Sequence, residues 1–417
     1  MKEKTVIGLT RLLTLLIITS LVSLAWPSPG LGVSSKAGGT QAGQVPIIDN
    51  GKIPQPPDKK VRTIIFKEDL TIGVREGDEN YMFGERVYFN VDDEGNIFVT
   101  DWDRKRIQKY GPDGKFLLSI GGEGQGPGEF KNVWEPEFDK DGNLYVVDIS
   151  QKRISFFGRD GRYLRQTGFP QINVSSSIYI NSRGRFLMAV DETKEEREGG
   201  MRWETIIGLY DNTFRPIEIF HREMHEMRAP GSREEDSIAR ALAASMSDTA
   251  FRPEPHYLLA SNDEIYFGYS NAYEIKVYSP EGKPARAIRK DYKPVPVTAK
   301  DKERFEEYQR VEFLRFLPAQ AEKVTEKALR LIQYPKFKPA YQGFALADDG
   351  WLFVIINSEG SERTVLDVFD GQGHYVSRTE AAIPSEGLRL KKGKAYAIAT
   401  EDGYKSVKRF SYAVREN

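Results

Sequence analysis

Two stretches of the chain repeat each other at an offset of 47 residues. The first reads VDDEGNIFVTD over 91–101 and the second reads FDKDGNLYVVD over 138–148. In each stretch an acidic turn with glycine separates two segments rich in β-branched and aromatic residues, which is typical of a β-hairpin because glycine tolerates the positive φ of a tight turn. Each copy continues into a Lys-Arg-Ile strand and a second Asp-Gly turn, at 113–114 and 160–161. One repeat therefore predicts a four-stranded antiparallel sheet.

Weaker copies of this pattern follow along the chain. Their first hairpins span 178–190, 257–269, 344–356 and 388–400, and each is followed by a later strand. Six copies with a period of about 40–50 residues fit the blades of a β-propeller. The strand-like segment 61–66 precedes the first copy, and we expect it to join the last blade as its outer strand, because such closure removes exposed sheet edges. The sequence predicts an all-β, six-bladed β-propeller over 61–417.

Two insertions interrupt the repeats. The segment 218–247 is charged and predicted to be helical from Glu234 onwards, and 298–333 has apolar residues at helical spacing. We expect both to pack on the rim of the propeller. The alternative is a lid or a docking element over one face.

The amino terminus carries a targeting signal. Lys2, Lys4 and Arg11 flank the apolar run 12–25, which is shorter than the ~20 apolar residues of a spanning helix. We predict a signal peptide or membrane anchor over 1–26, then a disordered linker rich in Pro, Gly and Ser over 27–60. The protein is expected outside the cytoplasm: periplasmic, secreted, or tethered to the outer side of the inner membrane.

The composition limits the chemistry that the chain can perform. There is no Cys, so disulfides and thiol nucleophiles are excluded, and only four His are present. Lys plus Arg number 60 and Asp plus Glu number 61. This near-zero net charge argues against a nucleic acid as the partner.

The glycine-rich segment GGEGQGPGEF at 121–130, followed by DGNLYVVD at 141–148 and KRI at 152–154, resembles an NHL repeat. The resemblance implies a six-bladed β-propeller of the kind that bacteria export. NHL domains bind proteins or RNA on one face of the ring, and a few related propellers are enzymes. The resemblance thus favours the fold more than a particular activity.

Several groups that could carry chemistry have a structural interpretation. Asp101 and Asp148 recur at one repeat position, and Arg106 and Arg153 at another, so we expect them to hold their blades together. The run 121–128 lacks the Gly-Lys-Ser/Thr ending of a phosphate loop and is predicted to connect two blades.

On a helix His221 and His225 would share one face, with Glu226 adjacent, and three such groups can ligate a metal ion. The segment lacks the His-Glu-x-x-His pattern, and a solvated charged face is the favoured interpretation. The sequence predicts no metal, no cofactor and no catalytic residue.

A binding surface is predicted where the loops between second and third strands meet the connections between blades. Its aromatic, cationic and amide side chains are Trp102, Arg104, Lys105, Asn132, Trp134, Glu135, Gln151, Lys152, Asn271 and Tyr273, joined by Glu359 and Arg363. Aromatic residues beside Arg are typical of recognition surfaces, although these Trp side chains could instead wedge between blades. The predicted function is recognition of a protein or an envelope polymer through this face. The alternative is a metal-dependent hydrolase or lyase of the lactonase-like propeller type acting at the central channel.

Overall fold

The computed structural model describes residues 45–169, 172–197, 200–232, 234–316, 322–358 and 363–416, with backbone only for Arg197 and 312–316. The predicted signal segment, 1–26, and the linker up to residue 44 lie outside the described residues. Among the helices that are described, none combines the length and the apolar character needed to cross a membrane.

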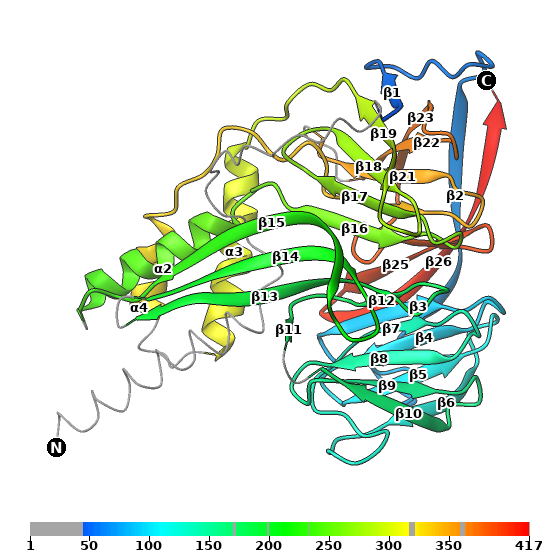
Figure 1. Ribbon diagram of the computed structural model, residues 1–417. Coiled ribbons are helices and arrows are strands. Elements are labelled where there is room, and N and C mark those ends of the chain that lie inside the picture. The colour runs from blue at the N-terminus through cyan, green and yellow to red at the C-terminus, as the bar shows by residue number, and fades with distance from the viewer. Residues whose placement is uncertain are drawn as a thin grey trace.

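Six antiparallel sheets form the body of the protein, so the predicted fold class is confirmed (Figure 1). The first two blades are the clear sequence repeats. Their strands are β3 (Val87–Val91), β4 (Ile97–Asp101), β5 (Arg106–Tyr110) and β6 (Phe116–Gly121), then β7 (Val133–Phe138), β8 (Leu144–Asp148), β9 (Arg153–Phe157) and β10 (Tyr163–Gly168).

The third and fourth blades follow the same order with additions. The third has β11 (Asn173–Val174) and β12 (Tyr179–Ile180) on its inner side, then β13 (Phe186–Arg197), β14 (Gly200–Tyr210) and β15 (Pro216–Arg228). The fourth has β16 (Pro255–Leu259), β17 (Ile265–Tyr269), β18 (Glu274–Tyr278), β19 (Pro284–Lys290) and, outside them, β1 (Ile47–Asn50).

The fifth blade contains β20 (Gly343–Leu346), β21 (Leu352–Ile356), β22 (Thr364–Phe369) and β23 (Tyr375–Ala381). The sixth combines the two ends of the described chain: β24 (Arg389–Lys391), β25 (Lys394–Glu401), β26 (Tyr404–Glu416) and β2 (Arg62–Ile72). Strand β2 pairs with β26 as the outermost strand, as predicted for 61–66, and so closes the ring.

An apolar cluster lies between each pair of neighbouring blades, including the sixth and the first. The alternation of side chains along a strand explains how one blade serves two clusters. In β4, Ile97 and Val99 face the sixth blade, whereas Phe98 faces the second. The central strands β4, β8 and β21 are consequently buried along their whole length, and the core is a ring of six interfaces.

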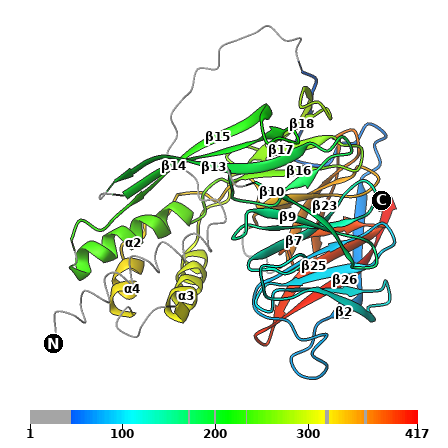
Figure 2. The same cartoon turned by 60° about the horizontal axis from the view of Figure 1, so that its bottom comes forward.

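The third blade departs from the others because its strands are much longer. Strands β13–β15 project beyond the ring as a sheet that we call the arm (Figures 1 and 2). Helices α2 (Glu235–Thr249), α3 (Ala299–Phe316) and α4 (Glu322–Leu329) lie on one side of it. The predicted helices are confirmed, but 218–228 belongs to the outer strand of the blade, so the first insertion begins only after Arg228.

The helices have a small core of their own. Ala243 and Met246 of α2 pack on Val324 and Ala328 of α4, and Arg310 of α3 forms an ion pair with Glu326 of α4 at 2.6 Å.

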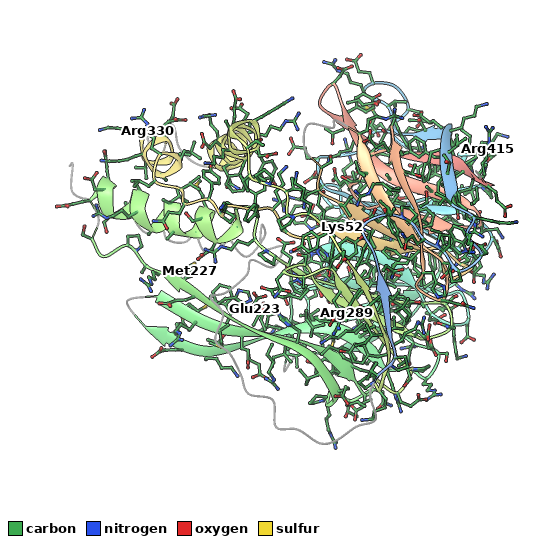
Figure 3. The ribbon with its side chains drawn as sticks, turned by 90° about the horizontal axis from the view of Figure 1, so that it is seen from above. Lys52, Glu223, Met227, Arg289, Arg330 and Arg415 are labelled. Atoms are coloured by element: carbon green, nitrogen blue, oxygen red, sulfur yellow. The ribbon has the colours of Figure 1, made fainter. Side chains whose placement is uncertain are left out.

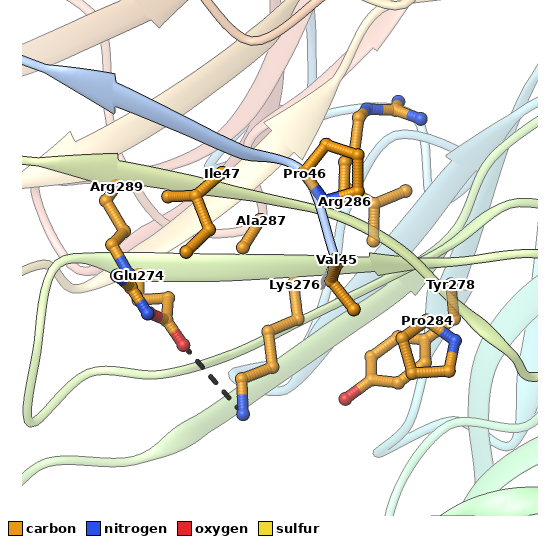
Figure 4. Close-up of a pocket in the computed structure, with 11 residues that line it drawn as sticks. Val45, Pro46, Ile47, Glu274, Lys276, Tyr278, Pro284, Arg286, Ala287 and Arg289 are labelled. Carbon is orange, nitrogen blue, oxygen red and sulfur yellow. Dashed lines mark hydrogen bonds and ion pairs between the residues drawn. The ribbon is translucent and has the colours of Figure 1, made fainter. Parts of the chain in front are cut away.

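Residues 47–50 correct the prediction of a disordered linker up to residue 60. They form β1, which pairs in parallel with β19 because the outer edge of the fourth blade offers unpaired backbone groups. The backbone hydrogen bonds include the amide of Ala287 to the carbonyl of Pro46 at 2.9 Å. Beside β1 runs an open groove of about 670 Å³, lined by Ile47, Lys276, Tyr278 and neighbouring residues (Figure 4).

Candidate functional site

Three loops emerge at one end of the ring because the strands of each blade alternate in direction. They are the β4–β5 loop (102–105), the β6–β7 connection (122–132) and the β8–β9 loop (149–152), and we call this surface the loop face. The indole Nε1 of Trp102 donates a hydrogen bond to Oδ1 of Asn132 in the next blade. The structure thus brings these two predicted residues together.

Two cations flank the Trp102 ring. The Lys105 ammonium lies 3.4 Å and the Arg86 guanidinium 4.4 Å from the ring centroid. Lys105 Nζ also donates to the Trp102 carbonyl at 2.8 Å, and burial lowers the pKa of Lys105 below its usual value. The partly exposed indole is therefore held rigidly with positive charge around it.

Buried carboxylates anchor two further loop-face residues. Asp101 accepts a hydrogen bond from Arg104 at 2.9 Å, and Asp148 accepts one from Gln151 at 2.7 Å. Asp101 and Asp148 are both buried. Their predicted role in holding the blades is confirmed.

Arg153 shows the same structural role. Its guanidinium donates to the carbonyls of Gln125, Gly126 and Glu129, at 3.1, 2.8 and 2.8 Å. It therefore fixes the glycine-rich connection between the first and second blades. Within that connection Gly121 has a φ of 83°, and a Cβ there would collide with the ring of Phe130 at 2.0 Å.

The remaining loop-face residues of the second blade contact neighbouring blades. Lys152 Nζ donates to Oδ1 of Asn173 at 2.9 Å, and the Trp134 carbonyl accepts from the hydroxyl of Thr100 at 3.1 Å. Trp134 is partly exposed at the start of the innermost strand.

The predicted binding residues of the fourth and fifth blades differ in their exposure. Asn271 is exposed, but Tyr273 is only 4% exposed and its hydroxyl donates to Asp367 at 2.9 Å. The prediction of Tyr273 as a surface residue is wrong, because its ring fills the interface between the fourth and fifth blades. Arg363 lies just before β22, and Glu359 lies outside the described residues.

The two candidate metal-binding histidines lie on β15 rather than on a helix. His221 and His225 share a face of the arm with Glu223, since alternate residues of a strand point the same way. Glu223 is labelled on this strand in Figure 3. His225 stacks on Trp203, with ring centroids 5.1 Å apart. Across the part of the chain that the structure describes, no three His, Asp or Glu side chains are placed to hold a metal ion.

A second polar group lies around the axis of the ring. We call it the axial cluster, and it consists of Asn90, Glu135, Glu137, Ser177 and Arg389. Arg389 Nη2 lies 2.5 Å from Glu135 and 3.0 Å from Glu137. Asn90 donates to Glu137 at 2.9 Å, and the Ser177 hydroxyl donates to Glu135 at 3.1 Å. These residues come from the sixth, first, second and third blades.

The surroundings of the axial cluster alter its protonation. Burial raises the pKa of the Glu137 carboxyl to about 7, and Glu135 adds to this rise, although Arg389 opposes it. Burial disfavours the charged form of Arg389, but Glu135 and Glu137 raise its pKa above the usual value. The side chains of Arg389 and Glu135 still keep 24% and 20% of their surface accessible.

Of the axial cluster, the sequence prediction contained only Glu135. The missed signal is a repeat position that lies opposite the second residue of the central strand in the first five blades and opposite the third residue in the sixth. It is occupied in blade order by Asn90, Glu137, Tyr179, Leu258, Ala345 and Arg389. Polar residues at a position that is apolar in the fourth and fifth blades mark the site, but the sixth repeat resembles the first two only weakly.

Comparisons with known proteins agree with this architecture. Residues 86–227 match the model of DUF5128, a family described as a 6-bladed beta-propeller. A candidate exported protein of Bacteroides fragilis has a similar structure, with a TM-score of 0.50 and 11% identity over 89% of this chain and 99% of that protein. No curated protein matches the sequence significantly.

Two further solved structures resemble the chain at lower TM-scores. Virginiamycin B lyase from Staphylococcus aureus gives 0.42, at 10% identity over 83% of this chain and 99% of the lyase. A DUF4221-family member from Bacteroides vulgatus gives 0.45, at 9% identity over 85% of this chain and 99% of that one. At such identities the likeness concerns the fold alone, and the protein is a six-bladed β-propeller.

Proposed function

We propose that this protein is an exported binding module that recognises a protein or an envelope polymer through the loop face. The observation that carries the proposal is the Trp102 platform, in which Asn132 fixes the indole and Lys105 and Arg86 flank its ring. A side chain fixed before binding loses little conformational entropy when the ligand arrives. The two cations favour a partner that presents carboxylates or other acidic groups.

Export is proposed from the sequence. The cationic flank and the short apolar run within 1–26 are typical of a signal peptide. The NHL assignment of the repeats is likewise a proposal, supported by the GGEGQGPGEF segment and by the six blades. Fractionation of tagged protein tests export, and recovery of full-length protein in the soluble cytoplasmic fraction would contradict it.

The binding proposal is tested by pull-down from envelope extract. The variant Trp102→Ala/Lys105→Ala removes the platform, and Arg159→Ala is the matched control, since Arg159 is an exposed cation paired with Glu94 in the turns at the other end of the blades. We expect a partner retained by the wild type and by the control to be lost from the double variant. An equal amount of that partner on all three folded proteins would contradict the proposal.

A second candidate function is a hydrolase or lyase acting at the axis. The observation that favours it is Glu137, whose pKa of about 7 lies near an operating pH suited to general acid–base catalysis, beside the Arg389 cation. Turnover of a panel of lactones and esters, with and without EDTA, tests this candidate and its metal dependence. Equal turnover by the wild type and Glu137→Gln would show that Glu137 takes no part in the reaction.

A further inference from the structure

Exposed apolar side chains gather on the rim of the ring where the described chain begins and ends. Figure 1 shows β1, the segment that joins it to β2, and the paired ends of β2 and β26 along one side of the ring, at the top of the view. Of the fourteen large hydrophobic side chains that are exposed in the described part of the chain, five lie on these elements. We call them the rim patch, and they are Ile47, Ile53, Val61, Ile65 and Val414.

The rim patch takes no part in the core of the ring. None of its five residues belongs to an apolar cluster between blades. Ile53, in the segment between β1 and β2, is 63% exposed, the highest value among the large hydrophobic residues described. Along β2, Ile64 and Phe66 point to the fifth blade, so Ile65 points the other way, to solvent. Apolar side chains concentrated in this way on one side of a molecule mark a contact surface.

Cations are in excess around the rim patch, although the whole chain has a net charge of −1. Four exposed cations have no ion-pair partner among the described residues, namely Lys52, Lys59, Lys67 and Arg415. Figure 3, which views this side from above, labels Lys52 and Arg415. Lys60 Nζ neutralises Glu416 at 2.8 Å, and Arg62 neutralises Asp58. Of the described carboxylates in 45–67 and 411–416, Asp49 alone is left to oppose the four cations.

The rim patch also lies where a membrane anchor would join the ring. The described chain begins at Val45, next to β1, and the predicted signal or anchor segment ends at residue 26. The 18 residues of 27–44 span at most about 60 Å when fully extended. An uncleaved anchor would therefore hold this side of the ring within that distance of the bilayer. The open groove beside β1, which is lined by Ile47 and Ala287, adds apolar surface here.

We propose that the rim patch rests on the surface of a lipid bilayer with anionic headgroups. Its aliphatic side chains enter the headgroup region, and the four cations meet the lipid phosphates. The half-buried rings of Phe66, Trp351 and Tyr412 lie beside it, and aromatic rings are typical at this depth of a membrane. A second copy of this chain is a poorer occupant, because it would present the same excess of cations. The inference goes beyond recognition through the loop face and does not depend on it.

Binding to vesicles tests the proposal. The chain is prepared without residues 1–26, so that the apolar run 12–25 cannot insert, and is sedimented with phosphatidylcholine vesicles that contain or lack phosphatidylglycerol. We expect the protein to sediment with the anionic vesicles and to be released as the salt concentration rises, because salt screens exposed charges. Absence of binding to the anionic vesicles, or binding of equal strength to both kinds, would overturn the proposal.

Two double variants locate the contact on the rim patch. Ile53→Asn/Ile65→Asn removes two of its apolar side chains, and Lys52→Gln/Lys67→Gln removes two of its cations. All four side chains are exposed, so both variants should melt as the wild type does. Each should weaken binding to the anionic vesicles about tenfold. Binding of wild-type strength by the two folded variants would place the contact elsewhere and contradict the proposal.

Matched controls make the same changes on other blades. Leu117→Asn/Leu164→Asn alters exposed residues of β6 and β10, and Lys115→Gln/Arg162→Gln alters exposed cations in the same two blades. Both should bind vesicles as the wild type does, and so should the loop-face variant Trp102→Ala/Lys105→Ala, which separates this proposal from the loop-face one. Dimerisation in solution that Ile53→Asn/Ile65→Asn abolishes, without any vesicle binding, would instead assign the rim patch to contact between copies.

Discussion

Arg389 Nη2 lies 3.0 Å from Oε1 of Glu137, although 252 residues separate the two in the sequence. The contact joins the sixth blade to the second, past the first blade that lies between them. The strands β2 and β26 close the ring at its outer edge. The contact between Arg389 and Glu137 adds a polar link between blades near the axis.

The first prediction concerns the pH dependence of stability. Glu137 has a folded pKa of about 7, above the ordinary value of 4.5. The protonated Glu137 carboxyl therefore contributes fully to the free energy of unfolding below pH 4.5, and this contribution is lost as the pH rises through 7. The reason is that the unfolded chain releases this proton at a lower pH than the folded protein does. Relative to the wild type, Glu137→Gln should gain roughly 1–3 kcal/mol of unfolding free energy between pH 5 and pH 8.

Urea unfolding of both proteins across that pH range measures this difference. Glu303→Gln, at an exposed position on α3, is the control and should follow the wild type at every pH. A constant offset between Glu137→Gln and the wild type would show that the carboxyl does not titrate there.

Arg153 gives a prediction about the repeat itself. Removing its guanidinium leaves the carbonyls of Gln125, Gly126 and Glu129 without their donor, so Arg153→Ala should lose about 1–3 kcal/mol of stability. The control Arg162→Ala removes an exposed Arg in the following turn, whose ion pair with Asp160 spans 4.0 Å, and should be nearly neutral. Equal melting temperatures for the two variants would refute the structural role of Arg153.

Asn50 gives a prediction about β1. Its side chain donates to the carbonyls of Arg289 and Gly373, both at 3.0 Å, and accepts from the amide of Tyr375 at 2.7 Å. It thereby ties β1 to the fourth and fifth blades together. Asn50→Ala should cost about 1–2 kcal/mol and increase hydrogen exchange at Ala287, whereas Lys52→Ala, exposed two residues later, should do neither. Unchanged hydrogen exchange at Ala287 in Asn50→Ala would show that the Asn50 side chain does not hold β1 against β19.

The fold was predictable because each blade is a local unit whose sequence pattern recurs several times along the chain. The turns at Gly95 and Gly142, the buried carboxylates of Asp101 and Asp148, and the arginines that follow each of them five residues later recur at one spacing. The closing strand was predictable from the need to cover an edge. Strand β1 was not, because Ile47–Asn50 is too short and too polar to stand out from its Pro-rich surroundings.

The site was harder to predict, since its residues differ from blade to blade, whereas the residues that build the fold recur in each blade. Tyr273 lay in a loop equivalent to that of Lys105, yet its ring packs between blades while Lys105 stays at the surface. Arg389 meets Glu137 only through ring closure, and no spacing along the chain predicts that contact. His221 and His225 share one face as they would on a helix, because a spacing of four residues does the same on a strand. The expected solvated face is wrong, since His225 is only 7% exposed.

The last prediction separates the helices from the ring. Met246 is 2% exposed and packs on α4, in a cluster that shares no residue with the inter-blade clusters. Met246→Ala should therefore destabilise the contact of α2 with α4 by about 2–4 kcal/mol while the blades remain intact. Hydrogen exchange should rise in 235–249 and 322–329 but stay at wild-type rates in β8 and β21. The control is Tyr308→Ala, which removes a ring that is 55% exposed on α3. In this variant the hydrogen-exchange rates of α2 and α4 should equal those of the wild type. If β8 and β21 lost protection together with α2, the helices and the propeller would unfold as one cooperative unit, and the arm with its helices could not act as a separate element.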